Sequence, residues 1–550
     1  MNATRATNRL ISLSIFLFGL GISLWYGRQG INPLDSSIIF DGAWRLMQGQ
    51  TYFRDFSTPN GFVPIIFQTL FFKLLGVNWF AYCLHAAVFN GLFALLANGI
   101  LRLAGGPRWL SAGYALMSAV VFYPPMGVPY MDQHAFFFVL LGVWIAMLAS
   151  QKRGRPQFWL ISSLPAVALL AVLSKQSPGI FAVPLSALVL LCWMPKRQWP
   201  STIAALLLGL VPAFVAFCVV VGLPWQILGP FWDAFWKMPQ SIADQRFAEW
   251  TYGPFKTLRA MAWFPFQTLS SFHFIHRHLL FAPFLLLLVE WAIRKWRQRP
   301  RAAWPPLRLL VMGIGMSVTC SFFMHFTLNQ PENGLPLVLV SIGLGHIFWR
   351  KWWQGFEFDF SGRFRHVPML MKGLSVLMLL YGGWATLQFH QKTNVPRLVL
   401  DFTPDFPFRP DIPKANHWGF LEYQAPFHYG SLKPWELTAW MDAHKGTFLL
   451  FGDLSILYGM TERPSVSPVL WFHEGLTYAP QGSAAFARLD RQLLEMTQKA
   501  KIRFVVFEHP EHLSWMHAQL EQFRITHRAL AVRQTASYEV GGFTVWELRK

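Results

Sequence analysis

The stretch TIAALLLGLVPAFVAFCVVVG, residues 202–222, is uncharged, apolar and long enough to cross a bilayer as one helix, which takes about 20 residues. Similar runs lie on both sides of it, so the sequence predicts a mainly α, polytopic membrane bundle of about eleven helices. A shorter apolar stretch at 62–75 contains Pro64 and Lys73, and here we predict a re-entrant or interfacial helix. The predicted spans are 10–26, 80–101, 109–123, 134–149, 158–173, 180–194, 202–222, 279–293, 307–326, 334–349 and 370–389.

The composition agrees with a membrane protein. Of the 550 residues, 53% are hydrophobic and 13% are charged, against about 25% charged residues in an average soluble chain. This excludes a wholly soluble fold, and the apolar content and the four cysteines exclude a disordered chain and a disulfide-rich scaffold. The net charge of +20 does not indicate nucleic-acid binding, because basic residues cluster in short segments between apolar runs, as at 151–155 and 294–299.

The basic clusters also predict the orientation of the chain. Cytoplasmic loops carry an excess of Lys and Arg, and here basic residues concentrate on the side of the membrane that holds the N-terminus. We therefore expect a cytoplasmic N-terminus, an uncleaved anchor at 10–26 and, with an odd number of spans, an extracytoplasmic C-terminal tail. The tail has no cysteine, which is typical of a bacterial envelope protein in the inner (plasma) membrane.

Residues 390–550 differ in character from the membrane domain predicted at 1–389. A Pro-rich segment at 395–413 is followed by periodic segments that predict a small extracytoplasmic (periplasmic) α/β domain. Strands are expected at 447–451, 502–507 and 543–548. An amphipathic helix is expected at 483–499, with Phe486, Leu489, Leu493 and Met496 on one face.

Acidic residues are scarce, so their positions are informative. An ionisable group near membrane depth is costly and marks a candidate functional site. Several such groups fall on the predicted outer face. They are Asp35, Asp41 and Asp55 in the segment 28–62, Asp132 beside the span 134–149, Lys175 and Gln176 between two spans, and Glu332 in the loop 327–333. Asp35 has a simpler explanation, as the N-cap of an amphipathic helix along the membrane interface.

The stretch DSSIIFDGAWRLMQGQTYFRDF at 35–56 resembles the first outer loop of the GT-C glycosyltransferases, the polytopic enzymes that use polyprenyl-phosphate-linked sugars. Protein mannosyltransferases and lipid A aminoarabinose transferases are of this type. Residues 125–132, 173–176 and 451–464 are similar to the same family. The Lys-Pro-Pro that some relatives carry after Asp-Phe is replaced here by residues 58–61, so the resemblance leaves the donor sugar open.

The resemblance implies a membrane glycosyltransferase, a hexosyl- or pentosyltransferase, that moves a sugar from a polyprenyl-phosphate donor to a lipid or glycan hydroxyl. Such a transfer needs a carboxylate base near the hydroxyl and a cation near the departing phosphate. Asp35 is our candidate base, and Lys175 is the candidate phosphate partner or, alternatively, a snorkelling anchor. Asp132 is a second candidate catalytic residue, for acceptor positioning, or caps the span that follows it.

Asp55 is expected to bind acceptor, to help hold a metal, or to stabilise its loop with Arg54. His134, Gln176 and Glu332 complete the predicted substrate-binding set, with a buried core histidine as the alternative for His134. No ligand spacing requires a metal, and a Mg²⁺ or Mn²⁺ site at Asp35 and Asp132 stays open.

Two other functions remain as alternatives. One is a transporter or flippase of a lipid-linked or small polar substrate, and the other is a glycan polymerase or ligase. A transporter is expected to carry paired repeats and polar groups at mid-membrane. Convergence of Asp35, Asp132 and Lys175 would favour sugar transfer.

Overall fold

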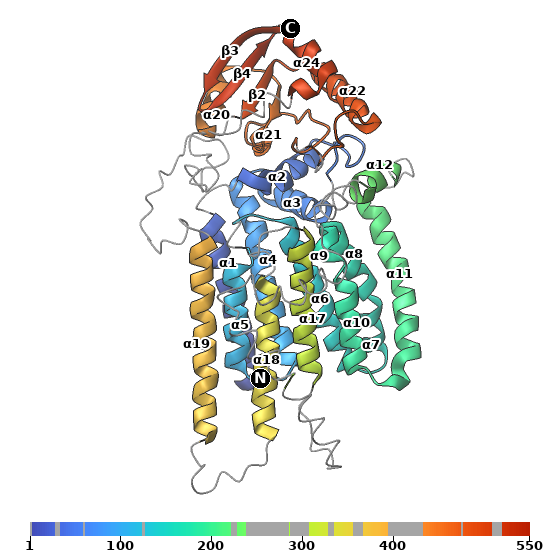
Figure 1. Cartoon of the computed structure of the whole chain (residues 1–550), viewed down its shortest axis with the longest axis vertical. Coiled ribbons are helices and arrows are strands. Elements are labelled where there is room, and N and C mark those ends of the chain that lie inside the picture. The colour runs from blue at the N-terminus through green and yellow to red at the C-terminus, as the bar shows by residue number, and fades with distance from the viewer. Residues whose placement is uncertain are drawn as a thin grey trace.

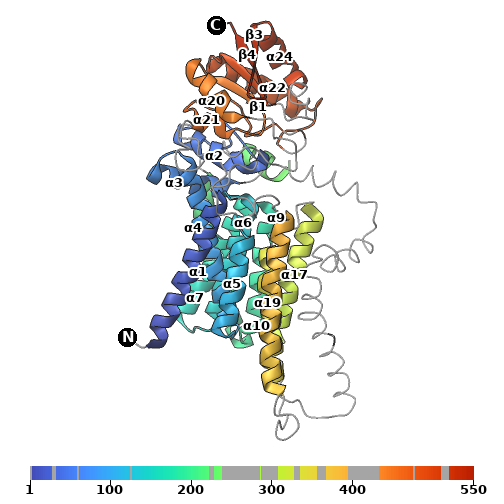
Figure 2. The same cartoon turned by 90° about the vertical axis from the view of Figure 1, so that its left-hand side faces the viewer.

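The structure of the chain is a computed structural model that describes residues 3–27, 33–58, 61–123, 127–221, 228–237, 285, 307–327, 335–355, 367–393, 433–472, 474, 477–508 and 520–549. A helical bundle forms one part, and a smaller unit with a β-sheet stands at one end of it (Figure 1). We call residues 433–549 the tail and the nearer end of the bundle its tail-side end. The N-terminus lies at the opposite end of the bundle (Figures 1 and 2).

Six helical segments of the described residues are long and apolar enough to cross a membrane. Every predicted span except 279–293, of which the structure describes only residue 285, falls on a helix or a pair of helices. The count of eleven is not confirmed. The bundle consists of α1 (Ala3–Gly27), α4 (Trp79–Leu103), α5 (Arg108–Val121), α6 (Met131–Ser150), α7 (Arg155–Ser162), α8 (Leu164–Ser174), α9 (Gln176–Gly179), α10 (Ala182–Trp193), η1 (Lys196–Gln198), α11 (Trp199–Val221), α17 (Arg308–Thr327), α18 (Leu335–Gly355) and α19 (Val367–Thr393).

Small residues allow close packing within the bundle. A Cβ on Gly19 of α1 would lie 2.9 Å from the Cα of Gly91 on α4, and Asn90 Nδ2 donates to the Gly19 carbonyl at 2.7 Å. Lipid tails are as apolar as the helix surfaces, so burial of apolar surface does not drive helices together in a membrane. Close backbone approach of this kind lets them associate through van der Waals packing.

Two helices lie between the bundle and the tail (Figures 1 and 2): α2 (Pro33–Met47) and α3 (Phe62–Leu75). Helix α2 buries Ile39, Phe40 and Ala43 completely, as its apolar spacing predicts. Helix α3 has 14 residues, too few to span a bilayer, and exposes Leu70 and Leu74. Both predicted helices are therefore present.

The tail contains a four-stranded mixed sheet in the order β1-β2-β4-β3. Strands β1 (Phe448–Phe451) and β2 (Phe504–Glu508) are parallel, with Phe448 opposite Phe504, while β4 (Phe543–Leu548) is antiparallel to β2 and to β3 (Gln534–Val540). The three predicted strands are present. We did not predict β3, an edge strand whose polar sequence is mostly exposed. The tail helices are α20 (Pro434–Ala443), α21 (Ile456–Met460), α22 (Ala484–Lys499) and α24 (Arg524–Ala531).

The central strands of the sheet are buried on both faces. Leu449 and Phe451 pack in one cluster with Leu493 of α22, the helix that the periodicity predicts, and Ser483 caps α22 by accepting from Phe486 N. Phe448 and Leu450 belong to the second cluster, which continues through α21 to α2 and the bundle. The tail and the bundle thus share one apolar core.

Candidate functional site

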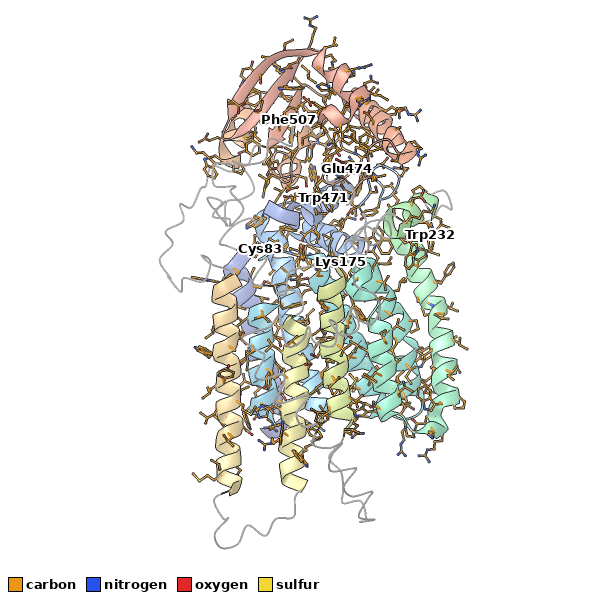
Figure 3. All side chains as sticks on the ribbon, in the orientation of Figure 1. Cys83, Lys175, Trp232, Trp471, Glu474 and Phe507 are labelled. Carbon is orange, nitrogen blue, oxygen red and sulfur yellow. The ribbon has the colours of Figure 1, made fainter. Side chains whose placement is uncertain are left out.

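Asp132 and Lys175 form an ion pair at the tail-side end of the bundle. Lys175 Nζ lies 2.7 Å from Asp132 Oδ1, the aspartate side chain is fully buried and the lysine side chain is 17% exposed. Figure 3 shows Lys175 at the end of the bundle, below Trp471 and Glu474 of the tail. The structure therefore brings together two predicted site residues that are far apart in sequence.

Local chain geometry explains how the pair forms. Lys175 has extended backbone angles, φ −160° and ψ 133°, and separates α8 from α9. Asp132 lies in the first turn of α6, where the helix dipole favours a carboxylate. The N-cap of α6 is Tyr130, so Asp132 is not the cap residue. Lys175 points its ammonium group at a buried carboxylate, which snorkelling alone does not require.

Asp35 lies on α2, two residues after the helix begins at Pro33. It therefore belongs to the first helical turn and is not the N-cap. Its side chain lies outside the described residues, so its role as base stays a prediction. Helix α2 nevertheless lies at the same end of the bundle as Lys175 of the ion pair (Figures 1 and 3).

Asp55 is held within its own loop. Its carboxylate pairs with Arg54 Nη2 at 2.7 Å and accepts from the backbone N–H of Thr51 at 2.6 Å. Partial burial opposes ionisation, but the hydrogen bonds from Arg54 and Thr51, with the charges of Arg54 and Lys499, lower the pKa of this carboxyl below its usual value. These contacts favour the loop-stabilising role among the three that we considered.

Gln176 holds a neighbouring segment against the site. Its Nε2 donates to the Phe235 carbonyl at 2.6 Å, which ties the start of α9 to the short helix η3 (Asp233–Lys237). Helix η3 directly follows α12 (Leu228–Trp232). Its predicted contact with substrate stays a prediction. Glu332 lies outside the described residues.

His134 belongs to a chain of buried polar side chains. Its Nε2 lies 2.9 Å from His85 Nε2, and its Nδ1 lies 2.5 Å from Tyr123 Oη. His85 Nδ1 in turn lies 2.9 Å from Gln68 Oε1. All four side chains are essentially inaccessible. Such contacts favour the core-histidine alternative, and the role of His134 in substrate binding stays a prediction.

An aromatic wall stands beside the site. The rings of Phe53 and Phe231 meet edge to face at 5.1 Å, and Phe231 stacks on Phe235 at 5.0 Å. Phe53 has φ of 64°, a left-handed conformation that is strained for a bulky residue. Phe231 and Phe235 are buried, whereas Trp232 and Trp236 are about half exposed.

Among the residues that the structure describes, no group of three or more His, Cys, Asp or Glu side chains is placed to hold a metal ion. The alternative of a cation between Asp35 and Asp132 stays a prediction, since the Asp35 side chain is outside this set.

We did not predict a second buried ion pair, between Asp41 and Arg45. Arg45 Nε lies 2.8 Å from Asp41 Oδ2, and both side chains are fully buried. Ser465 Oγ of the tail donates to Asp41 Oδ1 at 2.5 Å. The i, i+4 spacing within an apolar helix was a detectable signal of the pair. Ser465, the partner of Asp41 in the tail, is 424 residues away, so no local sequence pattern predicts this hydrogen bond.

No family model matches the chain, and no curated protein matches it. Several solved structures have a similar arrangement. ArnT from Cupriavidus metallidurans in the apo state has a TM-score of 0.48 and 12% identity, over 99% of this chain and 98% of that one. The oligosaccharyltransferase AglB from Archaeoglobus fulgidus, in complex with an inhibitory peptide and a dolichol-phosphate, has a TM-score of 0.43 and 11% identity over 98% of this chain and 74% of that one. The Archaeoglobus fulgidus oligosaccharyltransferase in complex with Zn and sulfate has a TM-score of 0.44 and 11% identity over 97% and 73% of the two chains.

Proposed function

We propose that this chain is a membrane glycosyltransferase that moves a sugar from a polyprenyl-phosphate donor to a lipid or glycan hydroxyl on the outer face of a bacterial inner membrane. The observation that carries the proposal is the buried Asp132–Lys175 ion pair at the tail-side end of the bundle. In this proposal the tail lies outside the cytoplasm.

Lys175 supplies the cation that the leaving group needs. As the bond between the anomeric carbon and the phosphate oxygen breaks, the electron pair stays with the phosphate, whose charge grows. A positioned ammonium group stabilises that charge, more strongly in a partly buried site than in water. Asp132 keeps the ammonium group in place, and the exposed part of Lys175 is where a phosphate oxygen meets it.

Asp35 is the proposed general base. The acceptor hydroxyl oxygen forms a bond to the anomeric carbon, and its proton passes to the Asp35 carboxylate. Helix α2, which carries Asp35, lies at the tail-side end of the bundle (Figure 2), and the proposal places the lipid-borne phosphate at that end. The aromatic wall of Phe53, Phe231 and Phe235 offers an apolar surface for the start of the prenyl chain.

The test is a transfer assay with membranes that contain the protein and a panel of radiolabelled polyprenyl-phosphate sugars, with and without EDTA. We expect at least one donor to be consumed by the wild type. The double variant Lys175→Met/Asp132→Asn removes both charges and should lose transfer. Lys433→Met is the matched control, because Lys433 forms an exposed ion pair with Glu436 in the tail, 3.2 Å long.

Transfer by the control but not by the double variant would support the proposal. If the double variant transfers sugar at the wild-type rate, the ion pair is not part of the site. Loss of transfer with EDTA would show that a divalent cation takes part.

A further inference from the structure

One segment of the tail, residues 463–469, is hydrogen-bonded to the region of the proposed site, and we call this segment the strap. Its backbone carbonyl groups accept hydrogen bonds from α2 and from the loop that follows it. Trp44 Nε1 donates to the Arg463 carbonyl at 2.9 Å, and Gln50 Nε2 donates to the Ser465 carbonyl at 2.9 Å. Ser57 N donates to the Pro468 carbonyl at 3.0 Å. The strap is thus bonded to the membrane part along much of its length.

The strap is also fixed to the body of the tail. The Arg463 guanidinium donates to the carbonyl groups of Met441 and Gly446, which precede β1 in the chain. A movement of the tail therefore carries the strap with it.

Arg45 is the centre of this contact. Its guanidinium is fully buried, pairs with Asp41, donates to the Ser467 carbonyl and lies 5.2 Å from the centre of the Phe56 ring. A buried charge is tolerated only when its partners are in place, and here one partner belongs to α2, one to the tail and one to the loop. Arg45 therefore joins three parts of the molecule.

After α2 the structure describes residues 48–58 and 61, which we call the first loop, and these residues connect this contact to the proposed site. Ser57 pairs with Val469 of the strap. Gly61 N donates at 2.9 Å to the carbonyl of Ser174, the residue before Lys175. A Cβ on Gly61 would lie 3.0 Å from the sulfur of Met131, the residue before Asp132. The first loop is thus in contact with the chain next to both members of the ion pair.

We propose that the strap is a structural part of the transfer site, and that Arg45 is a positioning residue that fixes the first loop over the Asp132–Lys175 pair by binding the Ser467 carbonyl. This inference rests on the proposed function. Arg45 touches neither donor nor acceptor in this account; it acts through the first loop, whose displacement by about 1 Å can lower a rate by about a hundredfold.

The variant Arg45→Lys keeps the charge that Asp41 needs but loses the planar group that reaches two partners at once. We expect kcat for transfer to fall about ten- to a hundredfold. The matched control is Arg503→Lys in the tail. Arg503 also binds an acid, Glu547 at 2.7 Å, and a carbonyl, that of Lys445 at 2.9 Å, and its change should leave kcat unaltered.

A cross-link separates positioning from a general loss of stability. Ser57→Cys/Val469→Cys places two thiols at directly paired positions of the first loop and the strap. Oxidation should cross-link the two cysteines. In the wild-type background the cross-linked protein should still transfer sugar, and in Arg45→Lys the cross-link should restore most of the lost rate. Reduction should remove that rescue. A merely structural role predicts a lower melting temperature for Arg45→Lys with kcat of the folded protein unchanged.

Three results would each overturn the inference: full transfer by Arg45→Lys, failure of the cross-link to restore the rate of that variant, and loss of transfer when the wild-type background is cross-linked. If the wild type transfers no sugar from any donor, the proposed function fails instead. The cross-linking yields with and without Arg45→Lys would then still decide whether Arg45 holds the first loop to the strap: equal yields would contradict it.

Discussion

Replacement of Lys175 by methionine keeps the length of the side chain and removes its charge. The buried Asp132 carboxylate, 2.7 Å from the lysine ammonium, is then left without its cation. Breaking a buried ion pair from one side costs about 3–5 kcal/mol of stability. Lys175→Met should therefore lower the melting temperature clearly, and Asp132→Asn should lower it too. The double variant Lys175→Met/Asp132→Asn leaves no unpaired charge, so it should regain most of the lost stability.

A measurement of donor binding separates the two roles of Lys175, which are binding the donor phosphate and pairing with Asp132 as a structural contact. A hydrogen bond to a charged group contributes about 1.5–3 kcal/mol, so loss of the ammonium should weaken polyprenyl-phosphate binding about ten- to a hundredfold. This loss should appear in the double variant although its stability is restored. The assay is displacement of a labelled polyprenyl phosphate from detergent-solubilised protein, beside thermal unfolding. Wild-type affinity in a stable double variant would refute the phosphate role and leave the pair as a structural contact.

Further predictions concern the base, the tail and its location. Asp35→Asn should lower the transfer rate about 10²–10⁴-fold, because an amide cannot accept the proton. The free energy of unfolding should change by no more than about 1 kcal/mol, the contribution of a carboxylate in a first helical turn. Normal turnover would remove Asp35 from the site. Burial and the nearby Asp453 raise the pKa of the Glu508 carboxyl from 4.5 to about 8. Since the unfolded chain releases this proton near pH 4.5 and the folded tail keeps it, stability is full below pH 4.5 and falls as the pH rises to about 8, by up to about 1.4 kcal/mol per pH unit. Thermal unfolding of Glu508→Gln should lack this slope, and an equal slope in variant and wild type would contradict the assignment. A reporter fused after Lys550 should be active only outside the cytoplasm, and cytoplasmic activity would reverse the predicted orientation.

Hydropathy predicted the helices of the bundle because length and apolarity are local properties of a span. The strands β1, β2 and β4 were predictable for a similar reason, since each is a short segment rich in apolar residues. Strand β3 was not, because the sequence QTASYEV is polar and its state depends on pairing with β4. An exposed edge strand carries no hydrophobic pattern of its own.

The candidate site was predictable as a set of residues but not as a geometry. Scarcity of charge near the spans singled out Asp132 and Lys175, because such groups are costly in a membrane. Their contact depends on how α6 packs against the break between α8 and α9, which no local pattern specifies. The i, i+4 spacing of Asp41 and Arg45 was a local signal that we did not use. The contact of Arg45 with Ser467 has no such signal, because the two residues are 422 positions apart.

The most direct test of the central claim uses purified protein in detergent, where no closed compartment exists and transport cannot be measured. The protein is incubated with radiolabelled polyprenyl-phosphate sugars and a lipid extract as acceptor, and the products are separated. We predict that sugar leaves at least one donor and appears on an acceptor, with an equal amount of free polyprenyl phosphate. Donors that all stay intact in detergent, but cross the bilayer when the same protein is in liposomes, would contradict sugar transfer and establish a transporter.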